Sequence, residues 1–376
     1  MNKELNKLLS ELISCASVTP DDAGCQTIIS KFLEDLGFHV SHIQNEDVAN
    51  MIAIYGSSGL TFSFVGHTDV VPVGDSKKWD TDPFELKEIN GLLYGRGTAD
   101  MKGSIACMLI AIKNLLSESK NIDGKIVVIL TSDEEGPAVN GIQKLVKNNL
   151  KDLNIDMCLV GEPSSKDTFG DTIKNGRRGS LSGKLTINGI QGHIAYPQNA
   201  KNPIHLLSPA LEKLIKREYD SGNDFFPPTS FQISNIQSGA GASNIIPGHL
   251  TLDFNFRYST ETNAEELKKI VVSILDSESL DYDIKWSHSG EPYLTKKSKL
   301  LDICKSSVKE VMNKEPSILT DGGTSDGRFM AKICNEVIEF GLINRSIHKV
   351  NECTSSEDLE NLEKVYRSTL QKIFKN

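Results

Sequence analysis

The stretch TFSFVGHTD, residues 61–69, consists of an apolar run followed at once by an imidazole and a carboxylate. Residues 61–66 are rich in aromatic and β-branched side chains, a pattern that predicts a buried strand. Ligands bind at the carboxyl ends of the strands in open α/β sheets. His67 and Asp69 therefore lie where a metal ion is expected.

Two further predicted strands also deliver carboxylates at their carboxyl ends. The run KIVVILT, residues 125–131, is followed by SDEEG with Glu134 and Glu135, and the strand at 155–160 is followed by Glu162. Between the first two strands, the glycine-rich turn GRGTADMKG at 95–103 carries Asp100 into an apolar helix at 104–116. Three strand ends and one turn thus present candidate ligands.

Size and charge restrict the class of protein. A chain of 376 residues exceeds the usual size of a single core, so two domains are expected. With 50 acidic and 41 basic residues the net charge is −9, which argues against a general binder of nucleic acid or anionic membranes. An anionic substrate then needs locally placed arginines. No run is long enough for a membrane span and no secretory pattern is visible, so a cytoplasmic location is expected.

The order of predicted elements indicates an α/β fold with an insertion. Up to about residue 178 helices alternate with strands, as in a largely parallel sheet covered on both faces. From 180 the pattern becomes strand 180–190, helix 203–217, strand 229–237, strand 247–257, helix 264–277 and strand 281–287, the βαββαβ order of a ferredoxin-like unit. Alternation resumes after Pro292. We therefore expect a discontinuous catalytic domain, 1–178 and 292–376, and an inserted α+β domain, 179–291, whose uncovered sheet face or edge favours a homodimer.

The candidate ligands are more informative together than singly. Each acidic residue alone is more often a helix cap or a solvated charge, but six ionisable residues lie at predicted strand ends or adjoining turns: His67, Asp100, Glu134, Glu135, Glu162 and His348. Imidazole and carboxylate ligands suit zinc or manganese. A pair of metal ions needs a bridging carboxylate, and Asp69 can hold His67 by its other ring nitrogen. One of the adjacent Glu134 and Glu135 can serve as general base and the other as ligand, and their adjacency does not decide which.

Five motifs in one order carry a family resemblance. They are GHTDVVP at 66–72, GRGTADMKG at 95–103, SDEEG at 132–136, GEP at 161–163 and IHKVNE at 347–352. With these motifs the chain resembles the co-catalytic di-zinc amidohydrolases and metallopeptidases over nearly its whole length. Within that family it is most similar to the desuccinylases that release succinate from N-succinyl-L,L-diaminopimelate in the synthesis of lysine and peptidoglycan precursors.

The resemblance implies a three-layer zinc-peptidase-like catalytic domain with two Zn²⁺ per subunit, for which Co²⁺ or Mn²⁺ could substitute. It implies that Asp100 bridges the two ions, that His67 and Glu162 complete one site, and that Glu135 and His348 complete the other. Glu134 is then the general base, which moves a proton from the attacking water to the departing amine.

The resemblance also implies residues that recognise substrate. Guanidinium groups pair bidentately with carboxylates, and the implied carboxylate-binding residues are Arg177 and Arg257. His193 is expected to enter the active site of the partner subunit and stabilise the oxyanion. Two loops with Asn244, Gly323 and Thr324 are expected to contact substrate. Two segments depart from the family pattern. A single Asp321 precedes the second loop, and the loop at 166–171 carries no family motif.

Three alternatives stay open at this point. A sister enzyme such as an acetylornithine deacetylase or an aminoacylase shares the metal ligands. A non-catalytic, metal-dependent dimeric binder would keep the ligands but not need Glu134 beside Glu135. A nucleotide-dependent oxidoreductase would need a glycine fingerprint directly after the first strand of a βαβ unit, which the sequence does not have at that place.

Overall fold

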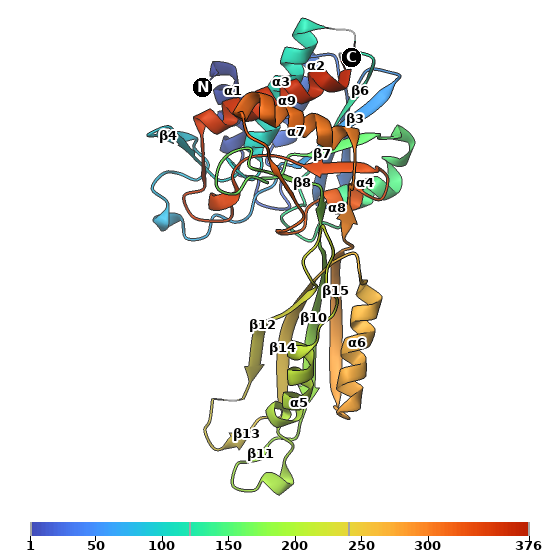
Figure 1. The fold of residues 1–376 in the computed structure, drawn as a ribbon. Coiled ribbons are helices and arrows are strands. Elements are labelled where there is room, and N and C mark those ends of the chain that lie inside the picture. Colours follow the sequence, from blue (N-terminus) through green and yellow to red (C-terminus); the bar gives the residue numbers. More distant parts are fainter. Residues whose placement is uncertain (1, 120–121, 240, 375–376) are drawn as a thin grey trace. The chain divides into compact units, whose positions relative to one another are not determined.

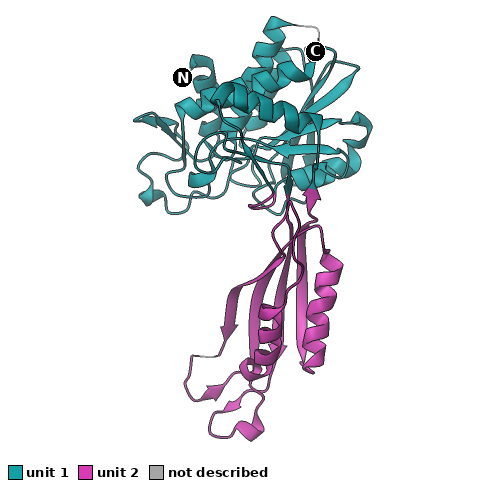
Figure 2. Cartoon of the chain, in the orientation of Figure 1, with its two compact units in different colours: residues 1–176, 294–319, 325–376 teal, residues 177–293, 320–324 magenta. Residues whose placement is uncertain are grey.

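The computed structural model describes residues 2–119, 122–239 and 241–374, and the chain divides into two compact units (Figure 2). Unit 1 comprises Met1–Gly176, Leu294–Leu319 and Ser325–Asn376, and unit 2 comprises Arg177–Tyr293 and Thr320–Thr324. Unit 2 is therefore an insertion within unit 1. The predicted inserted segment, 179–291, lies inside unit 2, whereas 320–324 had been assigned to the catalytic domain on sequence alone.

Unit 1 is built on a mixed sheet that has eight strands within the described residues, in the order β1-β2-β6-β3-β7-β18-β8-β17. β3 runs parallel to both β6 and β7, and β7 is also parallel to β18. β1 and β2 are antiparallel to their neighbours, so the parallel arrangement is confined to the middle and the far edge. The strands are β1 (His39–Asn45), β2 (Val48–Tyr55), β3 (Leu60–His67), β6 (Gly124–Thr131), β7 (Met157–Val160), β18 (Glu336–Glu339), β8 (Thr172–Lys174) and β17 (Ser317–Leu319).

Helices cover this sheet (Figure 1). They are α1 (Lys3–Ser14), α2 (Cys25–Asp35), α3 (Lys102–Glu118), α4 (Ile142–Asn148), α7 (Lys299–Met312), α8 (Gly327–Met330) and α9 (Ser356–Phe374). α3 is buried over most of its length, and its residues from Lys102 to Ile112 are all classed as buried. The apolar run that predicted a helix at 104–116 thus forms the central helix of the unit.

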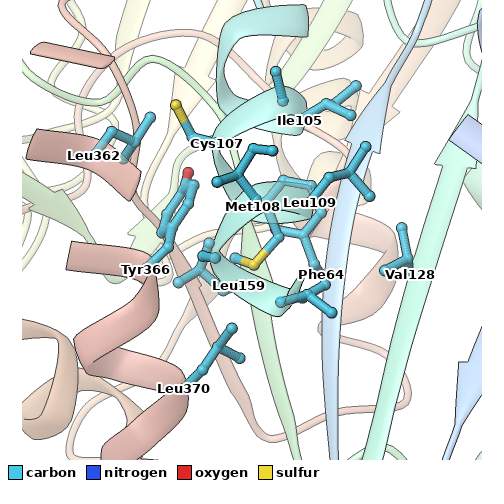
Figure 3. Close-up of a cluster of buried hydrophobic side chains, with 14 of the residues drawn as sticks. Phe64, Ile105, Cys107, Met108, Leu109, Val128, Leu159, Leu362, Tyr366 and Leu370 are labelled. Atoms are coloured by element: carbon cyan, nitrogen blue, oxygen red, sulfur yellow. The ribbon is translucent and has the colours of Figure 1, made fainter. Parts of the chain in front are cut away.

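The main core lies between the sheet and the helices α1, α2, α3, α7 and α9. Figure 3 shows its part between β3, α3 and α9. Alternate residues of β3, Phe62 and Phe64, enter this core, as the period of two in a strand requires. Phe64 packs edge-on against Tyr366 of α9, with ring centroids 5.9 Å apart. Burial of large side chains of this kind, at about 1.5–3 kcal/mol each, fixes the strand ends in space.

Shorter elements connect the main ones. They are β4 (Lys87–Ile89), β5 (Leu92–Tyr94) and β19 (Cys353–Ser355) in one small sheet, β9 (Gly176–Arg177) with β16 (Tyr293–Leu294), β11 (Gly192–His193) with β13 (Ile245–Ile246), and the 3₁₀ turns Ser76–Lys78, Lys151–Leu153, Pro197–Asn199 and Asn344–Ser346. The pairing of β19 with β5 brings the chain after His348 beside the chain before Asp100. The seven cysteines form no disulfide.

Unit 2 contains a four-stranded antiparallel sheet, as far as its residues are described, in the order β12-β14-β10-β15. Its elements follow the predicted βαββαβ order: β10 (Gly179–Asn188), α5 (Pro203–Lys216), β12 (Ser230–Ser238), β14 (His249–Tyr258), α6 (Ala264–Ser277) and β15 (Tyr282–Gly290). Alternate residues of β14, from Leu250 to Tyr258, pack in a core with α5 and α6. Hence one face of the sheet is covered by the two helices.

Among the described residues, no helix is long and apolar enough to cross a lipid bilayer.

Candidate metal centre

Three neighbouring strands of unit 1 bring candidate ligands to one edge of the sheet. β3 ends at His67, β6 is followed by Glu134 and Glu135, and β7 is followed by Glu162. Because β6, β3 and β7 are adjacent and parallel, their carboxyl ends lie side by side. Apolar side chains on both faces hold these strands in place, so the ionisable residues occupy fixed positions at the edge.

Asp100 lies between two histidines. Its Oδ1 is 3.3 Å from Nε2 of His67, and its Oδ2 is 3.3 Å from Nε2 of His348. The same nitrogen of His67 is 3.7 Å from Glu162 Oε1, and that of His348 is 3.0 Å from Glu135 Oε1. These contacts form two groups that share Asp100.

The donor atoms fit a pair of divalent ions. His67 Nε2 and Asp100 Oδ1 are buried and have no hydrogen-bond partner among the described residues, although they lie 3.3 Å apart. Two donors each about 2.0–2.1 Å from a tetrahedral zinc ion are separated by roughly 3.3 Å. His67, Glu134 and Glu162 lie close enough to hold one ion, and so do His67, Asp100 and Glu135. Imidazole and carboxylate donors suit zinc, manganese or cobalt better than magnesium.

Protonation of His67 and His348 balances the negative charge of the carboxylates beside them. Burial alone would lower the pKa of His67, but the contact with the Asp100 carboxylate and the charge of Glu162 raise it well above its usual range. Hydrogen bonds to Asp100 and Glu135 raise the pKa of His348 to about 10. Burial acts to raise the pKa of Asp100, but contact with the two histidines lowers it overall. A metal ion that binds here must displace the protons of the histidines.

Asp69 organises two strand ends at once. Its backbone oxygen lies 2.9 Å from Nδ1 of His67 and its carboxylate lies 3.6 Å from the same nitrogen. Its carboxylate also accepts the backbone N–H groups of Glu134 at 3.3 Å and Glu135 at 3.0 Å. Asp69 therefore fixes the ring orientation of His67 and the backbone that carries both glutamates.

Glu134 lies beside the two ligand groups, and its side chain is 12% exposed. Burial, followed by the charge of Glu162, raises its pKa well above the usual range. Nη1 of Arg328 is 3.9 Å from Glu134 Oε1. A carboxyl group with a raised pKa that keeps some access to solvent can both accept and return a proton.

Two ionisable residues near Glu134 were not singled out on sequence. Arg328 is one, and Asp326 is the other; burial raises the pKa of Asp326 to about 6 although Arg328 opposes this rise. Both follow the glycine-rich turn at 321–325, which had been noted only for Gly323 and Thr324. The only sequence signal for Asp326 and Arg328 was an aspartate and an arginine two positions apart in the segment SDGRF.

The predicted substrate-binding residues lie in unit 2. Arg177 is buried and its Nη1 donates a hydrogen bond to the backbone oxygen of Asp321 at 3.0 Å. Arg257 is half-buried on β14. Gly323 is exposed and Thr324 half-buried in the segment that groups with unit 2.

His193 and Asn244 occupy neighbouring positions in the same unit. His193 is on β11 and exposed, and its Nδ1 accepts the backbone N–H of Ala195 at 3.1 Å. Asn244 is exposed, and its backbone oxygen accepts the N–H of Ile194 at 3.0 Å. The structure thus brings His193 and Asn244 together on one exposed tip of unit 2.

Comparisons with known proteins agree with this architecture. A curated succinyl-diaminopimelate desuccinylase of Hydrogenovibrio crunogenus is 50% identical over 370 residues, which is 98% of each chain. Among solved structures, the M20 family metallo-carboxypeptidase Sso-CP2 of Sulfolobus solfataricus superposes with a TM-score of 0.85 at 18% identity, over 99% of each chain. The YXEP protein of Bacillus subtilis, described as a dinuclear metal-binding peptidase of the M20 family, has a TM-score of 0.74 at 14% identity, over 99% of this chain and 98% of its own.

The family model described as peptidase family M20/M25/M40 matches residues 63–372. That range begins within β3 and ends within α9, so it contains every candidate ligand described above. With this match and the 50% identity to a curated relative, the chain belongs to peptidase family M20/M25/M40.

Proposed function

We propose that this protein hydrolyses the amide bond of N-succinyl-L,L-diaminopimelate, releasing succinate and L,L-diaminopimelate for lysine and peptidoglycan synthesis. The observation that carries the choice of substrate is the 50% identity, over 98% of both chains, to a relative named for this reaction. The likeness to the carboxypeptidase and to YXEP, at 18% and 14% identity, concerns the fold alone and does not favour another substrate.

Two divalent ions, proposed to be Zn²⁺ with Co²⁺ or Mn²⁺ as substitutes, are assigned to the shared cluster. His67, Glu162 and Asp100 would hold one ion, and Glu135, His348 and Asp100 the other. The separate contacts of the two oxygens of Asp100, each 3.3 Å from a different histidine, support this division. When bound, the ions supply polarisation of the amide carbonyl and acidification of water.

Glu134 is the proposed general base. Its carboxylate takes a proton from the attacking water as the new C–O bond forms, and returns it to the amide nitrogen as the C–N bond breaks. The raised pKa of Glu134 and its position beside both ligand groups support this shuttle. Asp69 holds the backbone of Glu134 and so keeps the carboxylate directed at the reacting atoms.

Recognition of the anionic substrate is assigned to unit 2. Arg177 and Arg257 would pair with substrate carboxylates, and Asn244, Gly323 and Thr324 would contribute shorter polar or backbone contacts. We further propose that the protein is a homodimer in which His193 stabilises the oxyanion in the active site of the partner subunit. The exposure of Ile194 (57%) and Tyr196 (56%) beside His193 supports a protein contact at this tip.

The test is hydrolysis of N-succinyl-L,L-diaminopimelate and of N-acetylornithine by the same preparation, measured as release of primary amine. Protein stripped with a chelator is compared with protein reloaded with zinc. Zinc-dependent turnover of the succinyl compound alone is expected. Preference for N-acetylornithine would move the chain to a sister activity, full activity of the stripped protein would refute the metal mechanism, and inactivity on both compounds would revive the non-catalytic binder.

A further inference from the structure

Glu352 is a buried carboxylate with no part in the proposed reaction, and it has an unusually complete set of donors. The residue is 1% exposed. Its Oε1 accepts the backbone N–H groups of Gly97 at 3.2 Å, Ala99 at 3.0 Å and Asp100 at 3.1 Å. Its Oε2 accepts a hydrogen bond from Nη1 of Arg96 at 2.7 Å. The turn that carries Asp100 is therefore wrapped around this one carboxylate.

The same residue ends the loop that carries His348. The backbone oxygen of Glu352 accepts the N–H of Gly95 at 3.0 Å. Asn351 and Asp80 exchange two further hydrogen bonds, of 2.9 and 2.7 Å. His348 has a φ of 60°, a left-handed conformation that non-glycine residues adopt only where surrounding contacts enforce it. The contacts of Glu352 and Asn351 hold the end of this loop in place.

Arg96 extends the network to the segment that follows His67. Its Nη2 donates to the backbone oxygen of Pro72 at 3.3 Å, and its guanidinium lies over the ring of Trp79 at 5.3 Å from the centroid. Nε1 of Trp79 in turn donates to the backbone oxygen of Val73 at 2.9 Å. One buried carboxylate and its arginine thus connect the three segments that present His67, Asp100 and His348.

We propose that Glu352 is a positioning residue for the metal pair, which holds Asp100 and His348 at the separation that a divalent cation requires. This inference rests on the proposed two-ion function. It goes beyond that function because Glu352 contacts neither the ions nor the substrate. The geometry favours this role over a general structural one, because all four of its donors belong to the turn of Asp100 and its own backbone belongs to the loop of His348.

The test measures metal binding in the absence of substrate. Metal-free wild-type protein, E352Q and E352D are titrated with Co²⁺ while the visible absorption of the bound ion and the binding heat are recorded. Glutamine keeps the size but turns a donor toward Arg96, and aspartate keeps the charge but is one methylene too short to reach all four donors. We expect both variants to bind the ion that depends on His348 about 10–100-fold more weakly, with an altered absorption spectrum, as for other residues that orient metal ligands.

The control is a buried carboxylate elsewhere in unit 1. Glu363 of α9 is 9% exposed and contacts Asn114 at 2.8 Å and Arg367 at 3.4 Å. E363Q should lower the melting temperature but leave cobalt affinity and spectrum unchanged. Wild-type affinity and spectrum in E352Q, or equal weakening in E363Q, would overturn the proposal. Wild-type cobalt affinity and spectrum in E352D would also overturn the proposal, because the charge of residue 352 and not the position of its carboxylate would then be what matters.

The outcome does not depend on the substrate. A wild-type protein that binds two cobalt ions but does not hydrolyse the succinyl compound would refute the proposed reaction, and the comparison of E352Q with E363Q would still decide the role of Glu352.

Discussion

The carboxylate of Asp69 accepts the backbone N–H of Glu135 at 3.0 Å, although 66 positions separate the two residues. This hydrogen bond joins the end of β3 to the segment after β6, and it does so with the residue that also contacts His67. A buried acceptor that orients the ring of one proposed ligand on one side and the backbone of another on the other side affects the geometry of both.

D69N should therefore weaken metal affinity or turnover by about 10–100-fold, because the amide cannot accept both backbone N–H groups and contact His67 as the carboxylate does. Binding of Co²⁺ and steady-state kinetics measure the effect. D82N is the matched control, since Asp82 accepts the backbone N–H of Phe84 at 2.8 Å in an exposed turn. Normal metal affinity together with normal turnover in D69N would contradict this role.

E134Q should abolish detectable turnover, a loss of at least about 10²–10⁴-fold, while the metal content stays near that of wild type. The reason is that Glu134 is proposed to carry the proton and not the ion. E135Q provides the comparison, because it should lose metal as well as activity. Metal analysis of the purified proteins separates the two roles, and equal metal loss in E134Q would show that base and ligand have been exchanged.

H193A should reduce kcat by about 10²–10³-fold, the usual effect of removing one donor to an oxyanion, with folding and oligomeric state unchanged. Kinetics, circular dichroism and light scattering measure these properties. H205A is the control, because His205 is an exposed histidine on α5 of the same unit. Unchanged kinetics in H193A would remove this residue from the active site.

Metal binding should release protons at pH 7. The pKa of His348 is raised to about 10 and that of His67 is raised well above its usual range, so both rings are protonated in the metal-free protein. A metal ion requires the neutral ring, so uptake of two ions should release about two protons per chain, and metal affinity should fall as the pH is lowered. Calorimetry in two buffers with different ionisation enthalpies measures the release. A binding enthalpy independent of buffer would contradict the prediction.

Asp171 should stabilise the protein at neutral pH and not in acid. Burial acts to raise its pKa, but hydrogen bonds from the backbone of Thr168, Lys166 and Asp167 lower it overall. Because the folded-state pKa lies below the unfolded value of about 3.9, its contribution is present above that pH and is lost as the pH falls through the folded pKa.

We expect D171N to be less stable than wild type by roughly 1–2 kcal/mol at pH 7, a value reduced for partial exposure, with the difference shrinking as the pH falls below the unfolded pKa of about 3.9 and through the folded pKa. Melting temperatures across this range measure the effect. D167N changes a neighbouring exposed carboxylate and should have little effect. A D171N deficit that stayed constant down to pH 3 would exclude the ionised carboxylate as its cause.

Local patterns were sufficient to predict the centre of unit 1. The runs at 61–66 and 125–131 are strand-sized and rich in aromatic or β-branched residues, and they form β3 and β6. The ligands directly after them could be found without the structure for the same reason. Asp100 and His348 lie in turns with no periodicity, so they were candidates by their place in turns beside predicted strands, and only the family resemblance suggested their roles.

Such sequence patterns could not predict the direction or the order of the strands. β2 reads as a buried strand in either direction, and its antiparallel pairing with β6 is a property of the assembled sheet. The contact between Arg328 and Glu134 joins positions far apart in the chain, and Arg328 does not differ from an ordinary surface charge in its own neighbourhood. The role of Glu352 likewise depends on the turn of Asp100, which begins more than two hundred residues earlier.

The pairing of β7 with β18 has a consequence for biosynthesis. β7 begins at residue 157 and β18 at residue 336, and the whole of unit 2 lies between them in the chain. While the ribosome synthesises that insertion, β7 is an unprotected edge strand, the kind of element that recruits other chains. His348 emerges later still, so a nascent chain cannot assemble the complete set of ligands. Loading of the proposed metal pair can therefore be completed only after the chain that forms β18 has been made.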